Sequence, residues 1–234
     1  MTDVPDRRRR GEGHVFGRRK GKTLRAGQAK AVAELLPVLS LDLSKPPPTN
    51  LAELFAEPVG DITFEIGFGG GERLIAEARE RPDAGFLGAE PFVNGLAKAV
   101  VEIGRLGLKN VRLHGDDAAA VLDWLPAACL ARVDLFYPDP WPKKRHAKRR
   151  FVNAANLDRI ARVLKGGGRF RFASDIANYA NRTLMMANAH PAFAWDAARA
   201  DDWRVPPPGW TTTRYEAKAR AAGRAPAWLI FTRT

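Results

Sequence analysis

The sequence FYPDPWPKKRHAKRRF, residues 136–151, sets a single acidic side chain directly ahead of a dense run of cations. The acid, Asp139, lies between Pro138 and Pro140, and Trp141 follows. Proline fixes its own backbone and restricts the residue before it, so we expect this carboxylate to be held in one position. A carboxylate held in this way can accept hydrogen bonds from the N–H groups of a bound base. The competing interpretation is an ordinary charged surface turn.

The cations after Asp139 are of the types that bind phosphate oxygens. They contribute affinity and a steep salt dependence, whereas the choice of base must come from other groups. Trp141 has two interpretations: a stacking surface for an extruded base, or a side chain packed under the loop that holds Asp139 in place. The predicted RNA-binding residues are Lys144, Arg145, His146, Lys148, Arg149 and Arg150, and Lys143 begins the same run.

A second group of candidate residues follows three predicted strands. The sequence EIGFGGG begins at Glu65, and its glycines allow a sharp turn and a close approach of the backbone to a ligand. Glu90 ends the next predicted strand, where an acid can accept hydrogen bonds from both ribose hydroxyls of an adenosine. An acid after the third strand would lie level with the adenine amino group; alternatively, each acid caps the next helix. The predicted cofactor-binding residues are Glu65, Gly67, Gly69, Gly71, Glu90, Asp116 and Asp117.

The acid ahead of the glycines bears on which adenosine cofactor binds. In a dinucleotide enzyme the turn and the helix start receive a pyrophosphate, which would repel Glu65. S-adenosylmethionine instead carries a positive sulfur and an ammonium group, and an acid attracts both. No GxxxxGK[ST] phosphate-binding loop occurs in the sequence. The pattern therefore favours S-adenosylmethionine over NAD or a nucleoside triphosphate.

Strand and helix patterns alternate from about residue 59 onward. This alternation predicts an α/β fold with a mainly parallel sheet, helices on both faces, and ligands at the carboxyl ends of the strands. The expected strands are residues 61–66, 85–90, 110–115, 132–137, 168–174 and 226–233, and the expected helices are 72–80, 93–107, 118–125 and 152–164. A further short helix is expected over residues 27–39.

Composition points to a polyanionic partner. The chain has 234 residues, a net charge of +12 and a pI near 10.3, which favours nucleic acid through phosphate contacts. An anionic membrane surface is the rival, but no apolar run reaches the roughly 18 residues of a membrane span. The single cysteine allows no internal disulfide and fits the cytoplasm. The four histidines lack a paired metal-binding spacing, so we predict no metal.

The chain divides in two by composition. Residues 1–50 are expected to form a basic N-terminal extension with one short helix, and its first part, rich in arginine, is expected to be disordered without a partner. Residues 51–234 are expected to form one large Rossmann-like α/β domain.

Six segments, taken together and in order, resemble the bacterial tRNA (guanine-N7-)-methyltransferases of the TrmB family. They are EIGFGGGE, FLGAEPF, HGDDA, DLFYPDPWPKKRHAKRRF, RFASD and TRYEAKARAAG. The resemblance runs from roughly residue 15 to the C-terminus and is most specific in the FYPDPWPKKRH segment. It implies a Rossmann-like class I S-adenosylmethionine-dependent fold with a seven-stranded sheet and an antiparallel last strand. It also implies transfer of a methyl group to N7 of guanine 46 in the variable loop of tRNA.

The resemblance assigns roles to matching positions. Glu65, Glu90 and Asp117 match cofactor contacts, with Asp116 as an alternative, and Asp139 matches both a cofactor contact and the catalytic residue. The substrate-binding matches are Lys143, Asp175, Thr213, Arg214, Tyr215 and Glu216. No obligate protein partner is implied, and a monomer or a homodimer is possible.

Several alternatives stay open on the sequence alone. Asp175 contacts substrate or caps a helix, Tyr215 stacks on RNA or packs in the core, and Arg214 with Glu216 forms a surface pair or contacts substrate. For the whole protein, one alternative is an exocyclic-amine N-methyltransferase of RNA or DNA, which the tyrosine before the first proline disfavours. Another is a basic RNA-binding module without catalysis, which the intact acids and glycines disfavour.

Overall fold

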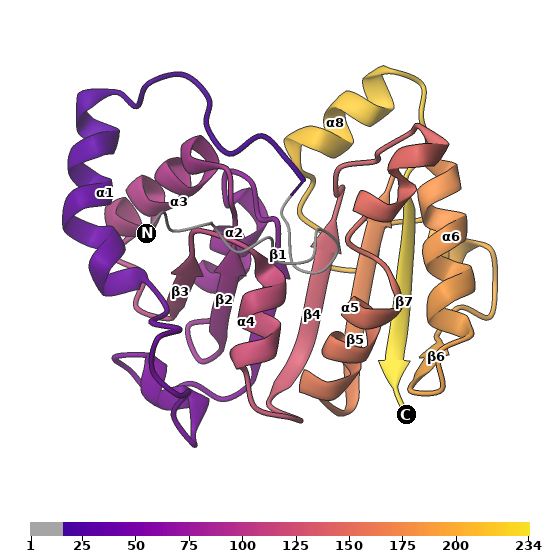
Figure 1. Ribbon diagram of the computed structural model, residues 1–234, viewed down its shortest axis with the longest axis horizontal. Helices are drawn as coiled ribbons and strands as arrows, with labels where there is room; N and C mark the ends of the chain where they lie inside the picture. Colours follow the sequence, from indigo (N-terminus) through magenta and orange to yellow (C-terminus); the bar gives the residue numbers. More distant parts are fainter. Residues whose placement is uncertain (1–15) are drawn as a thin grey trace, which may run out of the picture.

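The computed structural model describes residues 16–234, arranged as Figure 1 shows. The arginine run at residues 7–10 and the predicted disorder of the first residues lie outside the described residues.

Seven strands form one sheet in the order β3-β2-β1-β4-β5-β7-β6. β7 runs antiparallel to β5 and β6, and the other pairs are parallel. This confirms the predicted sheet with its antiparallel last strand. The short β6 has no sequence pattern of its own and is located only by its pairing with β7. The strands are β1 (Ile62–Ile66), β2 (Gly85–Ala89), β3 (Val111–His114), β4 (Leu130–Phe136), β5 (Leu164–Ser174), β6 (Phe193–Trp195) and β7 (Ala227–Arg233).

Helices cover both faces of the sheet, as predicted. One face packs against α4, α5 and α6, and the other packs against α2 and α3. The helices are α1 (Ala26–Leu39), α2 (Glu72–Glu80), α3 (Val93–Leu106), α4 (Ala118–Trp124), α5 (Ala154–Val163), α6 (Ala177–Asn188), α7 (Asp201–Arg204) and α8 (Arg214–Ala221), with 3-10 turns η1 (Leu51–Leu54) and η2 (Lys144–Arg149).

The two faces of the central strands differ in chemistry. Side chains alternate along a strand, so every second residue faces the same way. Toward α4, α5 and α6 these residues are apolar, as with Phe64, Val133 and Phe170, and they are fully buried in the larger core cluster. Toward α2 the central strands carry Glu65 and other charged residues instead. The apolar face therefore supplies most of the hydrophobic stabilisation of these strands.

The segment before β1 continues the fold. α1 packs on α3 through a second, smaller apolar cluster that includes Leu35, Leu39 and Ile103. Ser40 forms a parallel bridge with Leu113 of β3. The amide of Leu41 donates to the carbonyl of Leu113 at 2.8 Å. Figure 1 shows α1 in indigo beside α3 at the β3 edge of the sheet. This contact fixes where the chain that precedes α1 approaches the sheet.

The parallel strands point toward the upper end of Figure 1, and the loops there carry the predicted site residues. No helix in the described part of the chain is long and apolar enough to cross a membrane. Within residues 16–234, no group of three or more histidine, cysteine or acidic side chains is arranged to hold a metal ion.

Candidate active site

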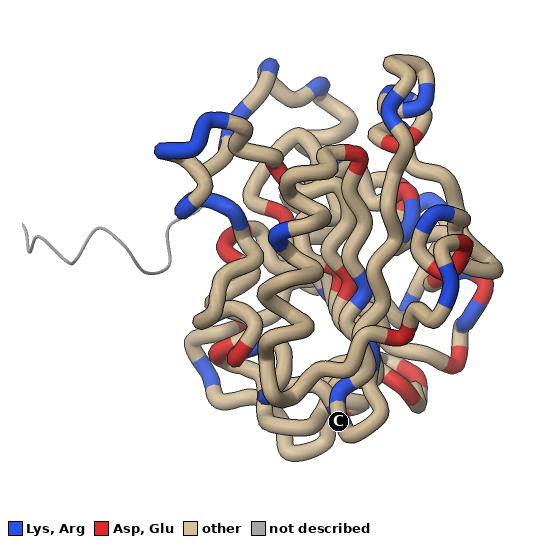
Figure 2. The backbone as a smooth tube through the Cα atoms, turned by 90° about the vertical axis from the view of Figure 1, so that its right-hand side faces the viewer, with Lys and Arg blue, Asp and Glu red and all other residues tan. Residues whose placement is uncertain are grey.

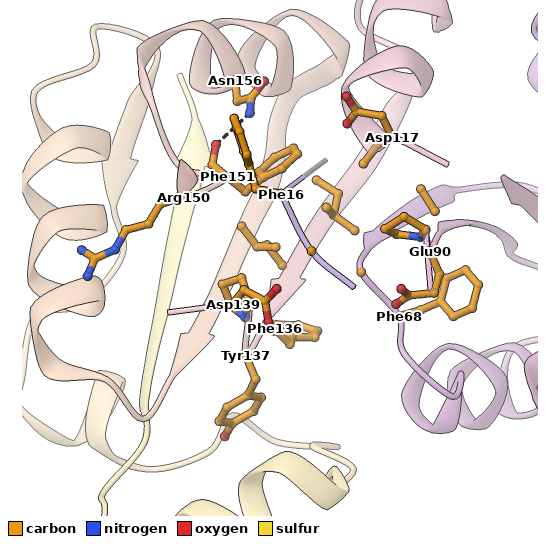
Figure 3. A pocket seen from close by; sticks show the side chains of 18 of the residues that line it. Phe16, Phe68, Glu90, Asp117, Phe136, Tyr137, Asp139, Arg150, Phe151 and Asn156 are labelled. Carbon is orange, nitrogen blue, oxygen red and sulfur yellow. Dashed lines mark hydrogen bonds between the residues drawn. The ribbon is translucent and has the colours of Figure 1, made fainter. Parts of the chain in front are cut away.

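A cavity of about 910 Å³ opens at the carboxyl ends of the central strands. Its walls come from the loops after β1, β2, β3 and β4, from the start of α5, and from chain segments before α1 and around α8. Figure 3 shows Asp139 and Glu90 on opposite sides of this space, with Asp117 above Glu90. The cavity therefore brings together residues that lie far apart in the sequence.

The glycine turn after β1 is built on left-handed backbone. Gly69 has a φ of 60° and Gly71, which precedes α2, has a φ of 80°, conformations that favour glycine over other residues. A Cβ at Gly71 would lie 2.9 Å from the Cβ of Ala99, and a Cβ at Gly95 would lie 2.4 Å from the carbonyl oxygen of Gly69. These close approaches hold the turn tightly against α3.

Glu90 fixes the same turn from β2. Its Oε2 accepts a hydrogen bond from the amide of Gly69 at 2.6 Å, and its Oε1 accepts one from the amide of Phe92 at 2.8 Å. Each oxygen of a carboxylate has a further lone pair for a ligand hydroxyl. Burial raises the pKa of Glu90, while the two backbone bonds oppose this rise. The position predicted for a ribose-binding acid is thus preorganised by the backbone.

The structure separates Asp116 from Asp117. Asp117 lines the cavity and caps α4, where its Oδ1 accepts from the amide of Ala119 at 2.9 Å. Asp116 pairs with Arg19, whose Nη2 lies 2.8 Å from Oδ1, and it is absent from the cavity wall. Asp117 is therefore the acid that can reach an adenine, and Asp116 holds the chain that precedes α1.

Glu65 lies at the floor of the cavity and is only 7% exposed. Burial and, after it, the nearby charge of Asp134 raise its pKa to about 8. Among the described residues no hydrogen bond or ion pair reaches this carboxylate. A buried acid without a partner is costly, and the ammonium group of S-adenosylmethionine would supply one. The glycine turn, Glu65, Glu90 and Asp117 therefore fit this cofactor.

The loop after β4 presents Asp139 between two strained residues. Tyr137 has a φ of 49° and Trp141 a φ of 42°, a region that costs non-glycine residues roughly 1–3 kcal/mol. The amide of Tyr137 donates to the carbonyl of Ala173 at 2.8 Å. Figure 3 shows the Tyr137 ring pointing away from Asp139. Strain on both sides of Asp139 indicates a loop whose shape is held for function.

Asp139 lines the cavity and is open to solvent on that side. The surrounding walls desolvate it enough to raise its pKa. A Cβ at Gly17 would lie 3.3 Å from its Oδ2, so the chain before α1 passes close to this carboxylate. The charge of Asp139 also raises the pKa of Glu90, after the larger effect of burial. The acid on the loop and the acid on β2 therefore face one space.

Residues 16–22 form a strap across the mouth of the cavity. Its middle is tied to the start of α3: the carbonyl of Arg19 accepts from the amide of Val93 at 2.9 Å. Asn94 makes two further bonds, to the amide of Gly21 at 2.7 Å and to the carbonyl of Lys22 at 2.6 Å. Residues 16–18 line the cavity itself. The role of this basic segment could not be assigned from the sequence, whereas the structure places it over the site.

Trp141 lines the cavity and is not packed in the core. The guanidinium of Arg149 lies 4.9 Å from the centre of the Trp141 ring and 5.5 Å from that of Phe16. His146 contacts Trp141 edge to face at 5.9 Å. This position leaves Trp141 accessible for stacking, which stays a prediction.

The cationic run divides into three parts. Lys143, Lys144 and Arg145 are exposed outside the cavity wall, while Lys148 and Arg149 line it. Arg150 also lines the cavity, but it is only 4% exposed. Its Nε donates to the carbonyl of Pro140 at 2.9 Å and its guanidinium lies 4.7 Å from the Tyr179 ring centre. Arg150 therefore supports the Asp139 loop from below.

Figure 2 shows Lys and Arg positions gathered around the point where the described chain begins, at the upper left of that view. This is the end of the molecule on which the cavity opens, so a polyanion would meet cations around the site.

The predicted substrate residues in and next to α8 differ in burial and in their bonding partners. Thr213 caps α8, because its hydroxyl oxygen accepts a hydrogen bond from the backbone amide of Glu216 at 3.2 Å. Glu216 is only 1% exposed, accepting from Trp210 at 2.6 Å and pairing with Arg220. Its partner is thus not Arg214, which lies 3.5 Å from Glu72.

Tyr215 and Asp175 complete this group. Tyr215 is 46% exposed, lies beside the glycine turn and lines the cavity, so it is not a core residue. Asp175 is bonded to Arg224 at 2.6 Å and is outside the cavity wall, and the residue that precedes α6 is Ile176 rather than Asp175. Only Thr213 and Tyr215 of the predicted substrate set reach the cavity directly.

A buried charged network beside Glu65 was not anticipated. It joins β4, β5 and α2 and contains Arg73, Glu77, Arg132, Asp134 and Arg171. A sequence signal was available: charged residues alternate with apolar ones in RVDLF and RFRF, although both strands are central in the sheet.

Comparisons with known proteins agree with this geometry. Residues 60–228 match a family described as "Putative methyltransferase". The chain is 60% identical over 218 residues to a tRNA (guanine-N(7)-)-methyltransferase of Chelativorans sp. (strain BNC1), covering 93% of this chain and 94% of that protein. It is 58% identical, with the same coverage, to the protein of that name from Rhizobium meliloti (strain 1021).

The fold is also found among solved structures. A SAM-dependent O-methyltransferase from Thermotoga maritima matches with a TM-score of 0.50 at 18% identity, covering 79% of this chain and 63% of that one. The chain thus spans less than two thirds of that protein, and the likeness concerns the fold alone. The full-length matches at far higher identity show the family. The chain belongs to the tRNA (guanine-N7)-methyltransferases, a family of S-adenosylmethionine-dependent enzymes.

Proposed function

We propose that this protein transfers a methyl group from S-adenosylmethionine to N7 of a guanine in tRNA, and that the target is guanine 46 in the variable loop. One observation carries the proposal: the acids suited to the cofactor and the acid suited to the base line a single cavity. Family membership gives the reaction class, and the cavity supports an assignment of roles to residues.

The donor end of the cavity consists of groups on strand ends. S-adenosylmethionine, when bound, supplies a methyl group on a positive sulfur. Glu65 would accept the ammonium group, Glu90 the ribose hydroxyls and Asp117 the adenine amino group. The left-handed glycine turn leaves room for the ligand beside the backbone of Gly67 and Gly69. All these groups are in place without the ligand, which lowers the cost of ordering them on binding.

The acceptor end is organised by Asp139. Guanine N7 has a lone pair and no proton near neutrality, so the reaction needs placement and exclusion of water rather than a strong base. Asp139 would accept hydrogen bonds from N1–H and the amino group of guanine, a pattern that adenine cannot offer. Its negative charge would also balance the positive charge that develops on the purine. Asp139 is the catalytic residue in this proposal.

The cations around the mouth would hold the tRNA backbone. Lys148 and Arg149 line the cavity, and Lys143, Lys144 and Arg145 are exposed next to it. Phosphate contacts of this kind give affinity without base choice. Tyr215 and Thr213 would meet the substrate from α8. We place the reaction in the cytoplasm, where tRNA is the partner, and the protein works as a monomer or homodimer.

Two other functions make different predictions. An exocyclic-amine methyltransferase needs a polar group before the first proline aimed at the base, but the Tyr137 ring points away from Asp139. A binding module without catalysis would have no use for a buried, unpaired acid at Glu65. Calorimetry with S-adenosylmethionine tests the second alternative directly, because such a module binds none.

The deciding experiment incubates the purified protein with labelled S-adenosylmethionine and unmodified tRNA, followed by nucleoside mass analysis. We expect 7-methylguanosine, and none when guanine 46 is replaced by adenine. Methyl on an exocyclic amine would establish the alternative enzyme, and methyl on a different guanine would overturn the assignment of the target.

A further inference from the structure

A row of charged side chains crosses the centre of the sheet directly behind the donor site. In the strand register Glu65 of β1 pairs with Asp134 of β4, and Asp134 pairs with Arg171 of β5. Partners in register project from the same face. Asp134 is only 1% exposed, and charged residues are rarely buried to this degree unless they are paired. This row is therefore a built feature of the fold.

Asp134 is the most heavily bonded carboxylate of the row. Arg171 donates from Nε to Oδ1 at 2.7 Å and from Nη2 to Oδ2 at 2.7 Å, a two-pronged contact. Arg132 donates from Nε to Oδ2 at 3.0 Å. Although burial opposes it, the charges of these two arginines hold the pKa of Asp134 below its ordinary value. Asp134 thus stays ionised and keeps both guanidinium groups engaged.

A second layer on α2 closes the network. Glu77 accepts from Arg73 at 2.5 Å, from Arg171 at 3.2 Å and from Arg132. Three guanidinium groups therefore face two carboxylates. Within residues 16–234, Glu65 is the acid beside them that has no hydrogen bond or ion pair, and it lines the cavity.

We propose that Asp134 is a positioning residue for the donor site: by engaging Arg132 and Arg171 it keeps them from pairing with Glu65, and so leaves the Glu65 carboxylate for the ammonium group of the ligand. The inference rests on the proposed function, because it takes Glu65 as the acid that receives this group. Without Asp134, an arginine from the network would be free to neutralise Glu65 and compete with the ligand.

The arrangement makes ligand binding release a proton. Burial, with the charges of Asp134 and Glu77, raises the pKa of Glu65 to about 8, while Arg73 and Arg132 oppose this rise. From β2 the facing residue is Gly88, which offers no charge. At pH 7 the free protein therefore holds a proton on Glu65. Pairing with an ammonium group requires the carboxylate, so this proton passes to solvent as the ligand binds.

Calorimetry with S-adenosylhomocysteine, which shares the amino-acid end of the donor, measures this proton. Titrations of the full chain at pH 6.5 are repeated in buffers of different ionisation enthalpy. The slope of the observed binding enthalpy against the ionisation enthalpy of the buffer gives the number of protons released. At this pH the α-ammonium of the ligand is charged. We expect on the order of one proton released per ligand. Glu65→Gln should release none and bind at least about tenfold more weakly.

Two variants of opposite charge separate electrostatics from structural damage. Asp134→Asn should lower the pH at which Glu65 ionises, so proton release at pH 6.5 falls and affinity drops about tenfold. Arg132→Gln removes a positive charge that lowers the pKa of Glu65, so the midpoint of proton release moves to higher pH. Asp61→Asn, which loses an exposed pair with Lys165 at the other end of β1, is the matched control and should match the parent protein.

The outcomes discriminate clearly. Opposite shifts of the pH midpoint in Asp134→Asn and Arg132→Gln support the proposal. Equal shifts, or the parental proton count in both, overturn it and leave the proposed function standing. A parent protein that binds no S-adenosylhomocysteine overturns both together. If Asp134→Asn does not fold, the shift in Arg132→Gln alone decides, since a purely structural role leaves the midpoint unchanged.

Discussion

The donor and acceptor ends of the cavity are held in different ways. At the donor end the backbone fixes the acids: Glu90 is bonded to two amides and Asp117 to one. At the acceptor end Asp139 stands on a loop that side chains support, chiefly Arg150 from below. A small cofactor can enter a preformed site, whereas a folded RNA must bring its base past the strap. In the proposed function the rigid end would determine where the methyl group lies, and the adaptable end would determine what can reach it.

The sharpest break between the two ends should come from Asp139→Ala. Loss of a group that acts mainly on the transition state should lower turnover about 100-fold or more, with donor and tRNA affinities changed by only a few-fold. Single-turnover kinetics and calorimetry measure the two effects. The control is Asp83→Ala, an exposed acid at the opposite end of the sheet. An unchanged single-turnover rate would remove Asp139 from the catalytic role.

Glu90→Gln should damage only the donor end. The glutamine side chain lacks the negative charge that strengthens the hydrogen bonds from the backbone amides of Gly69 and Phe92. A charge-assisted hydrogen bond contributes about 1.5–3 kcal/mol. We expect S-adenosylmethionine affinity to fall roughly 10- to 100-fold while tRNA affinity stays at the parental value. Filter binding of tRNA and calorimetry of the cofactor are compared with Glu80→Gln, an exposed residue that ends α2. Equal loss of both affinities would show that the ends are not independent.

The acceptor end itself can be divided by charge. Lys148→Gln with Arg149→Gln should weaken tRNA binding about tenfold at low salt and reduce the slope of log affinity against log salt by about 1–2. Arg150→Gln, which is buried, should keep this slope and lower turnover and thermal stability instead, because it supports the Asp139 loop. A flattened slope in Arg150→Gln would return that residue to the phosphate-binding group.

The smallest effect is expected at the strap. Asn94→Ala removes two bonds to residues 21 and 22, each contributing about 0.5–1.5 kcal/mol. We expect faster hydrogen exchange of the strap and donor dissociation accelerated a few-fold, with little change in the chemical step. Asn181→Ala on the exposed side of α6 is the control. Unaltered exchange would mean that other contacts hold the strap.

Much of the fold was predictable because its signals are local. Apolar runs of strand length, bounded by glycine or acidic turns, located six of the strands, and helical periodicity located α1 to α5 but not α6, α7 or α8. Only the short β6, defined by pairing with β7, lacked such a signal. The position of Asp139 at the end of β4 followed directly from the same reading.

The parts of the site that escaped prediction depend on distant contacts. Two adjacent acids precede α4, and only the pairing of Arg19 with Asp116 shows which one faces the cavity. The cationic run looks uniform in sequence, but Arg150, directly after η2, is buried, whereas Lys143, Lys144 and Arg145 are exposed. Left-handed backbone at Tyr137 and Trp141 is equally invisible, because neither is glycine.

The buried charged network beside Glu65 implies that changes which stabilise the fold can lower the activity. Buried ion pairs often contribute less to folding than well-packed apolar side chains of similar volume would. A redesign that fills this layer with such side chains is therefore expected to raise or preserve the melting temperature. The same redesign would bury Glu65 in hydrocarbon and raise its pKa still more, so that a ligand could no longer displace its proton near neutral pH. Heat-resistant versions of this enzyme are better sought on the apolar face, among α4, α5 and α6.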